Sequence, residues 1–135
     1  MTKENEMMKV VLLEPGKTAK ITEIDGSLEG MQKVVGGYIE AFYPFEEEVC
    51  MVCNEEGKLL GMSLNRGVKD EEGKIFEIIA GPCFICDCSG ENFGSLSEEQ
   101  AERYKEKFLL PERFMRMEGN IYAMPYRPKS KEQER

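Results

Sequence analysis

The sequence predicts an α+β fold: a single domain with a mostly antiparallel sheet and two helices packed on one face of that sheet. The length of 135 residues suits one compact domain, and a hydrophobic content of 41% is sufficient for a core. Short apolar runs alternate with turns that contain Gly and Pro, which is typical of antiparallel strands. Two further segments begin with helix-capping residues and account for the helices.

The domain is predicted to span residues 8–126, with a flexible leader over 1–7 and a disordered, charged tail over 127–135. Its first element is a hairpin. The strand-like runs Lys9–Glu14 and Thr18–Ile24 are separated by a Pro-Gly turn, so the two runs are expected to pair.

The two predicted helices are each marked by a cap. Ser27 can cap the first helix, whose apolar residues fall on one face and which ends at Gly36-Gly37. Ser97 opens the second helix with a capping box that includes Gln100. Pro111 interrupts this helix, and a second short turn is expected after it.

The remaining strands are predicted between the helices, over Tyr38–Tyr43, Val49–Cys53, Ile75–Ile79 and Cys83–Cys88. A turn at Asn54–Lys58 is expected to return the chain as a hairpin strand at Leu59-Leu60. A similar turn, Asp70–Lys74, is expected to join the Asn65-Arg66 segment to the strand that begins at Ile75.

Composition excludes several classes of function. Lys and Arg number 18 and Asp and Glu 26, so the net charge is −8, which argues against direct binding of nucleic acid. The chain has no histidine, which removes Ser-His and Cys-His nucleophile pairs. No apolar run is long enough to span a membrane, and the first residues do not resemble a signal peptide. We therefore expect a cytoplasmic protein that is not an enzyme and carries no cofactor.

The cysteines offer one apparent metal motif. Cys50 and Cys53 form one CxxC pair and Cys83 and Cys86 another, a spacing compatible with a zinc ribbon. The intervening residues are bulky strand formers, however, and positions i and i+3 of a strand point to opposite faces. Buried cysteines in strands are the favoured interpretation. A further alternative is that Cys86 and Cys88 form a redox pair or a weak metal-binding site.

A second group of residues could form a ligand site. A guanidinium and amide groups beside an aromatic ring can hold a phosphate, a carboxylate or a nucleobase. The alternative is that these residues have structural roles: Asn54 in a turn, Glu40 in an ion pair with a cation, and Arg66 covering a sheet edge. The candidates are Tyr38, Glu40, Asn54, Asn65 and Arg66.

Acidic clusters could instead contact a protein partner by presenting carboxylates to its basic surface. Glu46, Glu47 and Glu48 are the candidate contacts, although acids are also ordinary at turns such as Asp70–Glu72 and at the start of helices. The C-terminal region is rich in Met and aromatic residues. It is expected to form either a lid over the core or a homodimer interface.

Several of these segments together resemble a known group. They are Val34–Glu40, Cys53–Gly61, Leu64–Arg66, Ile79–Gly81 and Phe84-Ile85. Their combination resembles an uncharacterised domain-of-unknown-function family of phages and conjugative elements in Firmicutes and gut bacteria, from about Met8 to Phe108. The resemblance implies a small accessory protein of a mobile element, with no assigned catalytic residues.

The expected function is therefore stoichiometric binding to a host protein, with a counter-defence role as the consequence that the resemblance implies. Two alternatives remain open at this point. The protein could hold a nucleotide-like small molecule, or it could be a zinc-ribbon-like protein.

Overall fold

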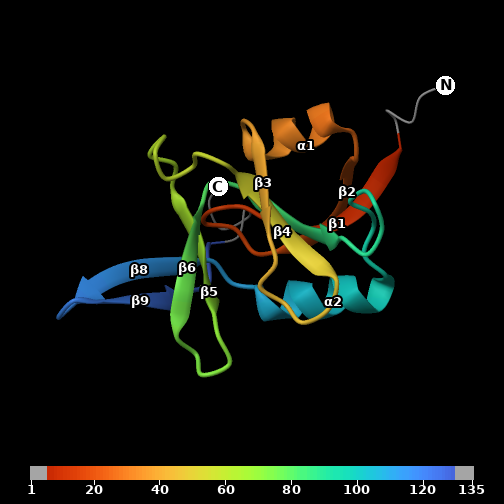
Figure 1. Cartoon of the computed structure of the whole chain (residues 1–135). Helices are drawn as coiled ribbons and strands as arrows, with labels where there is room; N and C mark the ends of the chain where they lie inside the picture. Colours follow the sequence, from red (N-terminus) through yellow and green to blue (C-terminus); the bar gives the residue numbers. More distant parts are fainter. Residues whose placement is uncertain (1–5, 130–135) are drawn as a thin grey trace.

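The computed structural model describes residues 6–129 and confirms a single α+β domain with mostly antiparallel sheets (Figure 1). Most of the predicted leader and part of the predicted tail lie outside the described residues. The first strand begins at Met7, inside the span predicted as a leader.

The elements follow one another as two helices and nine strands within this described range. They are β1 (Met7–Leu13), β2 (Lys20–Asp25), α1 (Leu28–Val35), β3 (Ile39–Phe42), β4 (Val49–Asn54), β5 (Leu64–Lys69), β6 (Ile75–Ala80), β7 (Cys83–Asp87), α2 (Glu98–Lys107), β8 (Glu112–Met117) and β9 (Asn120–Pro125).

Five strands form the central sheet, in the order β2-β1-β7-β4-β3, with every neighbouring pair antiparallel. The predicted hairpin at the start of the chain is present as β1 and β2. The central strands β4 and β7 are buried on both faces, which explains why their sequences are nearly continuous apolar runs.

The helices cover opposite faces of this sheet, so the prediction that both pack on one face is wrong (Figure 1). Successive residues of a strand point to alternate faces. Along β4, Cys50 and Val52 join Met31 and Val35 of α1 in one cluster. Met51 belongs to the other cluster, on the side of α2. β4 is apolar from Val49 to Cys53 and buried at every position, so both of its faces are covered, but the sequence alone did not reveal which helix covers each face.

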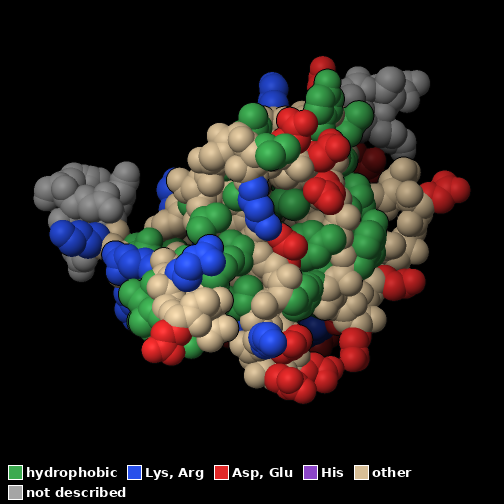
Figure 2. Space-filling model, turned by 60° about the vertical axis from the view of Figure 1, so that its left-hand side comes forward, with side chains coloured by type: hydrophobic (Ala, Val, Ile, Leu, Met, Phe, Trp, Pro, Cys, Tyr) green, Lys and Arg blue, Asp and Glu red, His purple; other side chains and the backbone are tan. Residues whose placement is uncertain are grey.

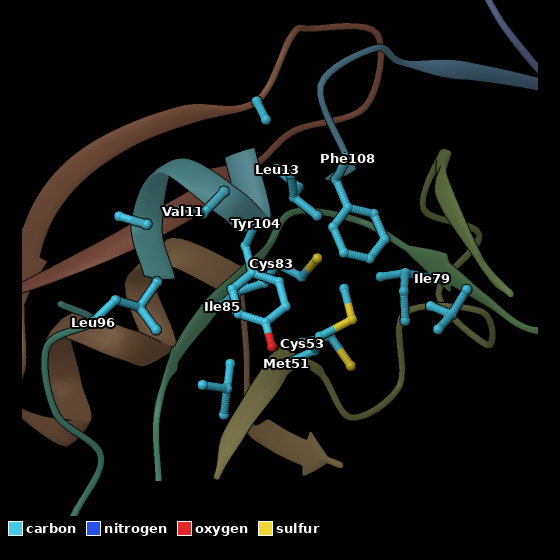
Figure 3. Packing of buried hydrophobic residues seen from close by; sticks show 14 residues of the cluster. Val11, Leu13, Met51, Cys53, Ile79, Cys83, Ile85, Leu96, Tyr104 and Phe108 are labelled. Atoms are coloured by element: carbon cyan, nitrogen blue, oxygen red, sulfur yellow. The ribbon is translucent and has the colours of Figure 1, made fainter. Parts of the chain in front are cut away.

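The core on the α2 side holds the rings of Tyr104 and Phe108 against β4 and β7 (Figure 3). Both helix caps are as predicted. The Ser27 hydroxyl accepts a hydrogen bond from the backbone N–H of Gly30 at 3.0 Å, and Ser97 and Gln100 complete a capping box.

The predicted strand at Leu59-Leu60 is absent from the structure. β4 already pairs with β3 on one side and with β7 on the other, so no edge of β4 is left for a third partner. Leu59 is 86% exposed and lies in a turn, and the chain pairs again only as the separate hairpin of β5 and β6. The second predicted turn, Asp70–Lys74, does join β5 to β6.

The segment after Pro111 forms a hairpin of β8 and β9 rather than a helical turn or a lid. The connecting residues Glu118 and Gly119 both have positive φ, the backbone conformation of a tight two-residue hairpin turn. In Figure 1 this hairpin projects away from the central sheet.

Candidate functional site

The candidate site is a hollow of about 1060 Å³ where three parts of the chain meet. The loop between β3 and β4 forms one side, the hairpin of β5 and β6 another, and α2 the third. Its lining residues are Pro44, Phe45, Glu46, Glu47, Val68, Lys69, Asp70, Glu71, Glu72, Phe76, Arg103, Tyr104 and Lys107. Two acidic segments that are far apart in the sequence therefore border one concave surface, which we call the acidic hollow.

Aromatic packing and hydrogen bonds fix the loop between β3 and β4 at the hollow. The ring of Phe45 lies 4.7 Å from the ring of Tyr104, centroid to centroid. The carboxylate of Glu47 accepts hydrogen bonds from Nε2 of Gln100 at 3.0 Å and from Nη1 of Arg103 at 2.7 Å. The Arg103 guanidinium holds the pKa of Glu47 below its usual range, against the opposing effect of burial. The carboxylate of Glu47 therefore holds the loop between β3 and β4 against α2.

The opposite side of the hollow is a tight turn. Oδ1 of Asp70 accepts hydrogen bonds from the backbone N–H groups of Glu72 and Lys74, each at 2.9 Å. Gly73 has a φ of +84°, which favours glycine at this position. The carboxylate of Asp70 is therefore hydrogen-bonded within the turn, whereas Glu71 and Glu72 are exposed to solvent.

The hollow keeps an uncompensated negative charge. Five carboxylates line it against three cations: Arg103 pairs with Glu47, Lys69 pairs with Glu112 at 3.4 Å, and Lys107 lies over the ring of Phe108. Glu46, Glu71 and Glu72 form no ion pair with any residue in the described part of the chain. Figure 2 shows acidic side chains gathered at the lower end of the molecule, where Figure 1 places the turn between β5 and β6.

Two of the three predicted partner contacts therefore lie at this hollow. Glu46 and Glu47 line it, whereas Glu48 lies outside it, and the backbone carbonyl of Glu48 accepts a hydrogen bond from the N–H of Cys88. Sequence reasoning named Asp70–Glu72 only as an ordinary acidic turn. Nothing in the sequence indicated that this turn would lie opposite Glu46.

The structure does not bring the five candidate ligand residues together. Arg66 and Asn65 are fully buried, and Tyr38 is 71% exposed. Glu40 and Asn54 do line one smaller hollow, of about 340 Å³, but the other three residues do not.

Arg66 and Asn65 use their polar groups inside the protein. Arg66 donates from Nη2 to the carbonyl of Lys17 at 2.8 Å and from Nη1 to Oδ1 of Asn65 at 2.9 Å. Nδ2 of Asn65 donates to the carbonyls of Leu13 and Gly81 at 2.9 and 2.8 Å. Burial lowers the pKa of Arg66, but its five bonded carbonyl and amide oxygens keep the charged form well solvated. This arrangement is structural.

Asn54 is also engaged internally, since Nδ2 donates to the carbonyl of Val35 at 3.1 Å and Oδ1 accepts from the N–H of Glu56 at 2.7 Å. The smaller hollow beside it carries four carboxylates, and its one lysine, Lys58, pairs with Glu77 at 2.7 Å. Such a surface disfavours the phosphate groups of a nucleotide.

The cysteines of the zinc motif are divided between the two faces of the sheet. Cys50 lies opposite Cys86 on the side of α1, and Cys53 lies opposite Cys83 on the side of α2. The sheet itself separates the two pairs, so the four thiols do not converge. Among the described residues, no group of three or more His, Cys, Asp or Glu is placed to hold a metal ion.

The Met- and aromatic-rich region after Pro111, for which the sequence left a core lid and a homodimer interface open, is an exposed surface. The pairing register places Met115, Met117, Tyr122 and Met124 on the same face of the hairpin of β8 and β9. Each is between 44% and 50% exposed, so the core-lid alternative is wrong, and the homodimer interface stays a prediction. The alternation of residue types after Pro111 and the Glu-Gly turn were the signals that could have predicted this hairpin.

Comparison with known proteins gives one match. The profile of a domain of unknown function, DUF3846, matches residues 8–109. The chain belongs to this uncharacterised family. The match confirms that the resemblance is to an uncharacterised domain family, and it includes the acidic hollow but ends before the hairpin of β8 and β9. No curated protein and no solved structure matches the chain. Among the described residues, no helix has the length and apolar character that crossing a membrane requires.

Proposed function

We propose that this DUF3846 protein acts without catalysis, by stoichiometric binding of a host protein whose basic surface enters the acidic hollow. The observation that carries the proposal is the placement of Glu46 opposite Glu71 and Glu72 around one concave surface, with none of the three in an ion pair with a described residue. Opposite charge across an interface speeds association and selects the partner.

The floor of the hollow supports the same proposal. Phe45, Val68 and Phe76 line it, and Phe76 is 53% exposed. An apolar centre bordered by charges is the usual anatomy of a protein–protein interface. A partner that places an Arg or Lys side chain against these rings would gain both apolar contact and charge pairing.

A host protein is the class of partner that follows from the mobile-element context implied by the sequence resemblance. Interference with a host defence is the proposed consequence. The absence of histidine supports a non-catalytic role, because it removes the most common general base.

Capture from a lysate of the bacterium that naturally carries the protein tests the proposal. The hollow variant is Glu46→Lys/Glu71→Lys/Glu72→Lys, which leaves the structural carboxylates of Glu47 and Asp70 in place. A matched control, Glu55→Lys/Glu56→Lys/Glu91→Lys, changes the net charge equally at exposed sites away from the hollow.

We expect the same bacterial protein to be captured by the wild type and the control, and at least about tenfold less by the hollow variant, since close charge pairs carry more than about 1.4 kcal/mol at such interfaces. Capture should also weaken as salt rises. Equal loss in both variants would show that only the overall charge matters. Unchanged capture by the hollow variant would exclude this surface.

A second binding surface is supported by the exposed face of the hairpin of β8 and β9. We propose that two copies of the chain pack these faces together, because Met115, Met117, Tyr122 and Met124 form a self-complementary apolar surface. Sedimentation of the wild type should then show a dimer, and Met115→Lys/Tyr122→Lys should be a folded monomer. A monomeric wild type at high concentration would exclude this interface.

A further inference from the structure

Three thiols lie on the α1 face of the central sheet, at the end where β4 and β7 pair. Cys50 and Cys86 are direct cross-strand partners, and their sulfur atoms are 3.9 Å apart. Cys88 follows Cys86 by two residues and therefore points to the same face. All three are free cysteines.

Accessibility differs within this group. Cys50 and Cys86 are fully buried, whereas Cys88 is partly exposed at the end of β7. A small solute therefore meets Cys88 first. β7 ends at Asp87, which pairs with Val49, and the N–H of Cys88 donates to the carbonyl of Glu48 just beyond that last pair.

The three thiols also divide in acidity. The hydrogen bond with Cys86 lowers the pKa of Cys50, burial opposes this effect, and a contact with Cys88 adds to the lowering. Burial, followed by the nearby charge of Cys50, raises the pKa of Cys88 to about 11. The shared hydrogen bond thus favours ionisation of Cys50 over that of Cys86, and Cys88 is the thiol that solvent reaches.

We propose that this group is a thiol–disulfide exchange site, in which Cys88 accepts oxidation from a small disulfide such as glutathione disulfide and passes it to the buried pair Cys50 and Cys86. The observations that carry the proposal are the 3.9 Å sulfur–sulfur contact and the graded exposure of three thiols on one face. The site lies on the opposite side of the sheet from the core cluster beside the acidic hollow, so it is independent of the proposed binding function.

The exchange proceeds in three balanced steps. The Cys88 thiolate attacks glutathione disulfide, forms a mixed disulfide and releases glutathione as a thiolate that takes up the proton. The Cys50 thiolate then attacks the Cys88 sulfur and releases the second glutathione. Finally the Cys86 thiolate attacks Cys50, forms the Cys50–Cys86 disulfide and returns Cys88 to a thiol. One disulfide is reduced to two thiols, and two protein thiols are oxidised.

Strand geometry favours Cys50–Cys86 as the final product. The Cα atoms of directly opposed residues in an antiparallel pair are about 4.5 to 5.5 Å apart, within the range that a disulfide spans. Cys50 and Cys88 are diagonal neighbours, at about 7 to 8 Å, so their disulfide requires backbone movement. Such movement is easiest at a strand end, where Cys88 lies.

The other cross-strand pair is an internal control. Cys53 and Cys83 also lie directly opposite each other, in the core cluster that holds Tyr104 and Phe108 (Figure 3). Cys53 is 8% exposed and lines the smaller hollow, but among the described residues no third thiol lies on this face to relay oxidation. Burial raises the pKa of both, that of Cys53 to about 11. We expect this pair to remain reduced.

The test is incubation of the full chain with glutathione disulfide, followed by alkylation in denaturant, intact mass measurement and peptide mapping. We expect loss of two hydrogen masses, a peptide linked through Cys50 and Cys86, and alkylated Cys53, Cys83 and Cys88. The reaction should accelerate as pH rises toward the pKa of Cys88, because the first step needs its thiolate.

Each variant should trap a different stage. Cys50→Ser should retain one glutathione on Cys88, Cys86→Ser should stop at a Cys50–Cys88 disulfide, and Cys88→Ser should slow oxidation of the buried pair at least about tenfold. Cys53→Ser should react as the wild type does. A link between Cys53 and Cys83, oxidation of Cys88→Ser at the wild-type rate, or a wild type with all five thiols still alkylated would overturn the proposal.

Discussion

The Nε atom of Arg66 donates a 3.0 Å hydrogen bond to the backbone carbonyl of Phe108, the residue that caps the C-terminus of α2. Its Nη2 atom donates to the carbonyl of Lys17 in the turn before β2. One fully buried side chain thus ties the hairpin of β5 and β6 to the helix and to the central sheet. The C-terminal end of a helix carries partial negative charge, which helps to stabilise the guanidinium there.

Replacement of Arg66 by Ala is therefore expected to destabilise the fold instead of removing a ligand contact. Loss of the guanidinium removes the donor to the buried carbonyl of Phe108 and to the partly buried carbonyls of Lys17 and Glu14, so the free energy of unfolding should fall by more than about 3 kcal/mol. Arg66→Lys should recover only part of this loss, because an ammonium group cannot reproduce the planar fork. Urea denaturation measures both.

Arg103→Ala provides the matched control, since Arg103 is exposed and makes one ion pair with Glu47. It should cost less than about 1 kcal/mol. If Arg66→Ala were as mild as Arg103→Ala, the structural role assigned to Arg66 would be wrong.

Gly30→Ala should destabilise the protein even though Ala is the better helix former. A Cβ atom at Gly30 would lie 2.3 Å from the backbone carbonyl oxygen of Asp25 and 2.5 Å from the Asp25 Cβ. Helix propensity alone predicts a gain of about 1 kcal/mol, whereas this clash with the backbone predicts a net loss of about 2 kcal/mol or more. Thermal melting shows whether Gly30→Ala raises or lowers the stability of the protein.

The exposed neighbour Lys33→Ala, in the same helix, is the control for propensity and should change stability by no more than about 0.5 kcal/mol. A Gly30→Ala variant that melts at or above the wild-type temperature would show that α1 does not pack against Asp25 as described.

Acid should weaken the attachment of the loop between β3 and β4. The pKa of Glu47 is lowered in the folded protein, chiefly by its hydrogen bond with Arg103. A depressed carboxyl pKa adds stability at pH values above the unfolded-state pKa, about 4.3 for Glu, and this contribution disappears as pH falls through the folded-state pKa. The stability difference between wild type and Glu47→Gln should therefore be largest above pH 5 and should shrink below pH 4.

The same comparison in an Arg103→Ala background isolates the interaction. There the pH dependence contributed by Glu47 should be much reduced, because its main hydrogen-bond donor is gone. Denaturant midpoints measured across this pH range for the four proteins give the answer. An unchanged pH dependence without Arg103 would assign the effect to another group.

The sequence was most informative where local rules decide the structure. Ser27 and Ser97 marked both helix starts, and the turn at Asp70 marked the hairpin of β5 and β6. It was least informative where tertiary contacts decide, as in the placement of the helices on opposite faces of the sheet. The continuous apolar run Val49–Cys53 of β4 indicates that both faces of the strand are covered, but it does not indicate which elements cover them.

The candidate site illustrates the same division. Glu46 was predicted to be a partner contact, which stays a prediction, and its place opposite Glu71 depends on how the loop between β3 and β4 and the hairpin of β5 and β6 pack. Arg66 and Asn65 were identified as ligand residues because of their chemistry. Because both side chains are fully buried, their role is structural. The backbone carbonyls that accept hydrogen bonds from Arg66 belong to Phe108 and Lys17, which are distant in sequence, so no local pattern could predict these contacts.

Site-specific photo-crosslinking tests the proposed binding function most directly. A photoreactive residue in place of exposed Glu71, at the edge of the acidic hollow, would report what lies against this surface in a lysate of the proposed bacterial host. The same residue in place of exposed Glu55, outside the acidic hollow, is the control. The account predicts a crosslink from position 71 to one bacterial protein with a basic surface and none from position 55. A partner that crosslinks from position 55 and not from position 71 would contradict it.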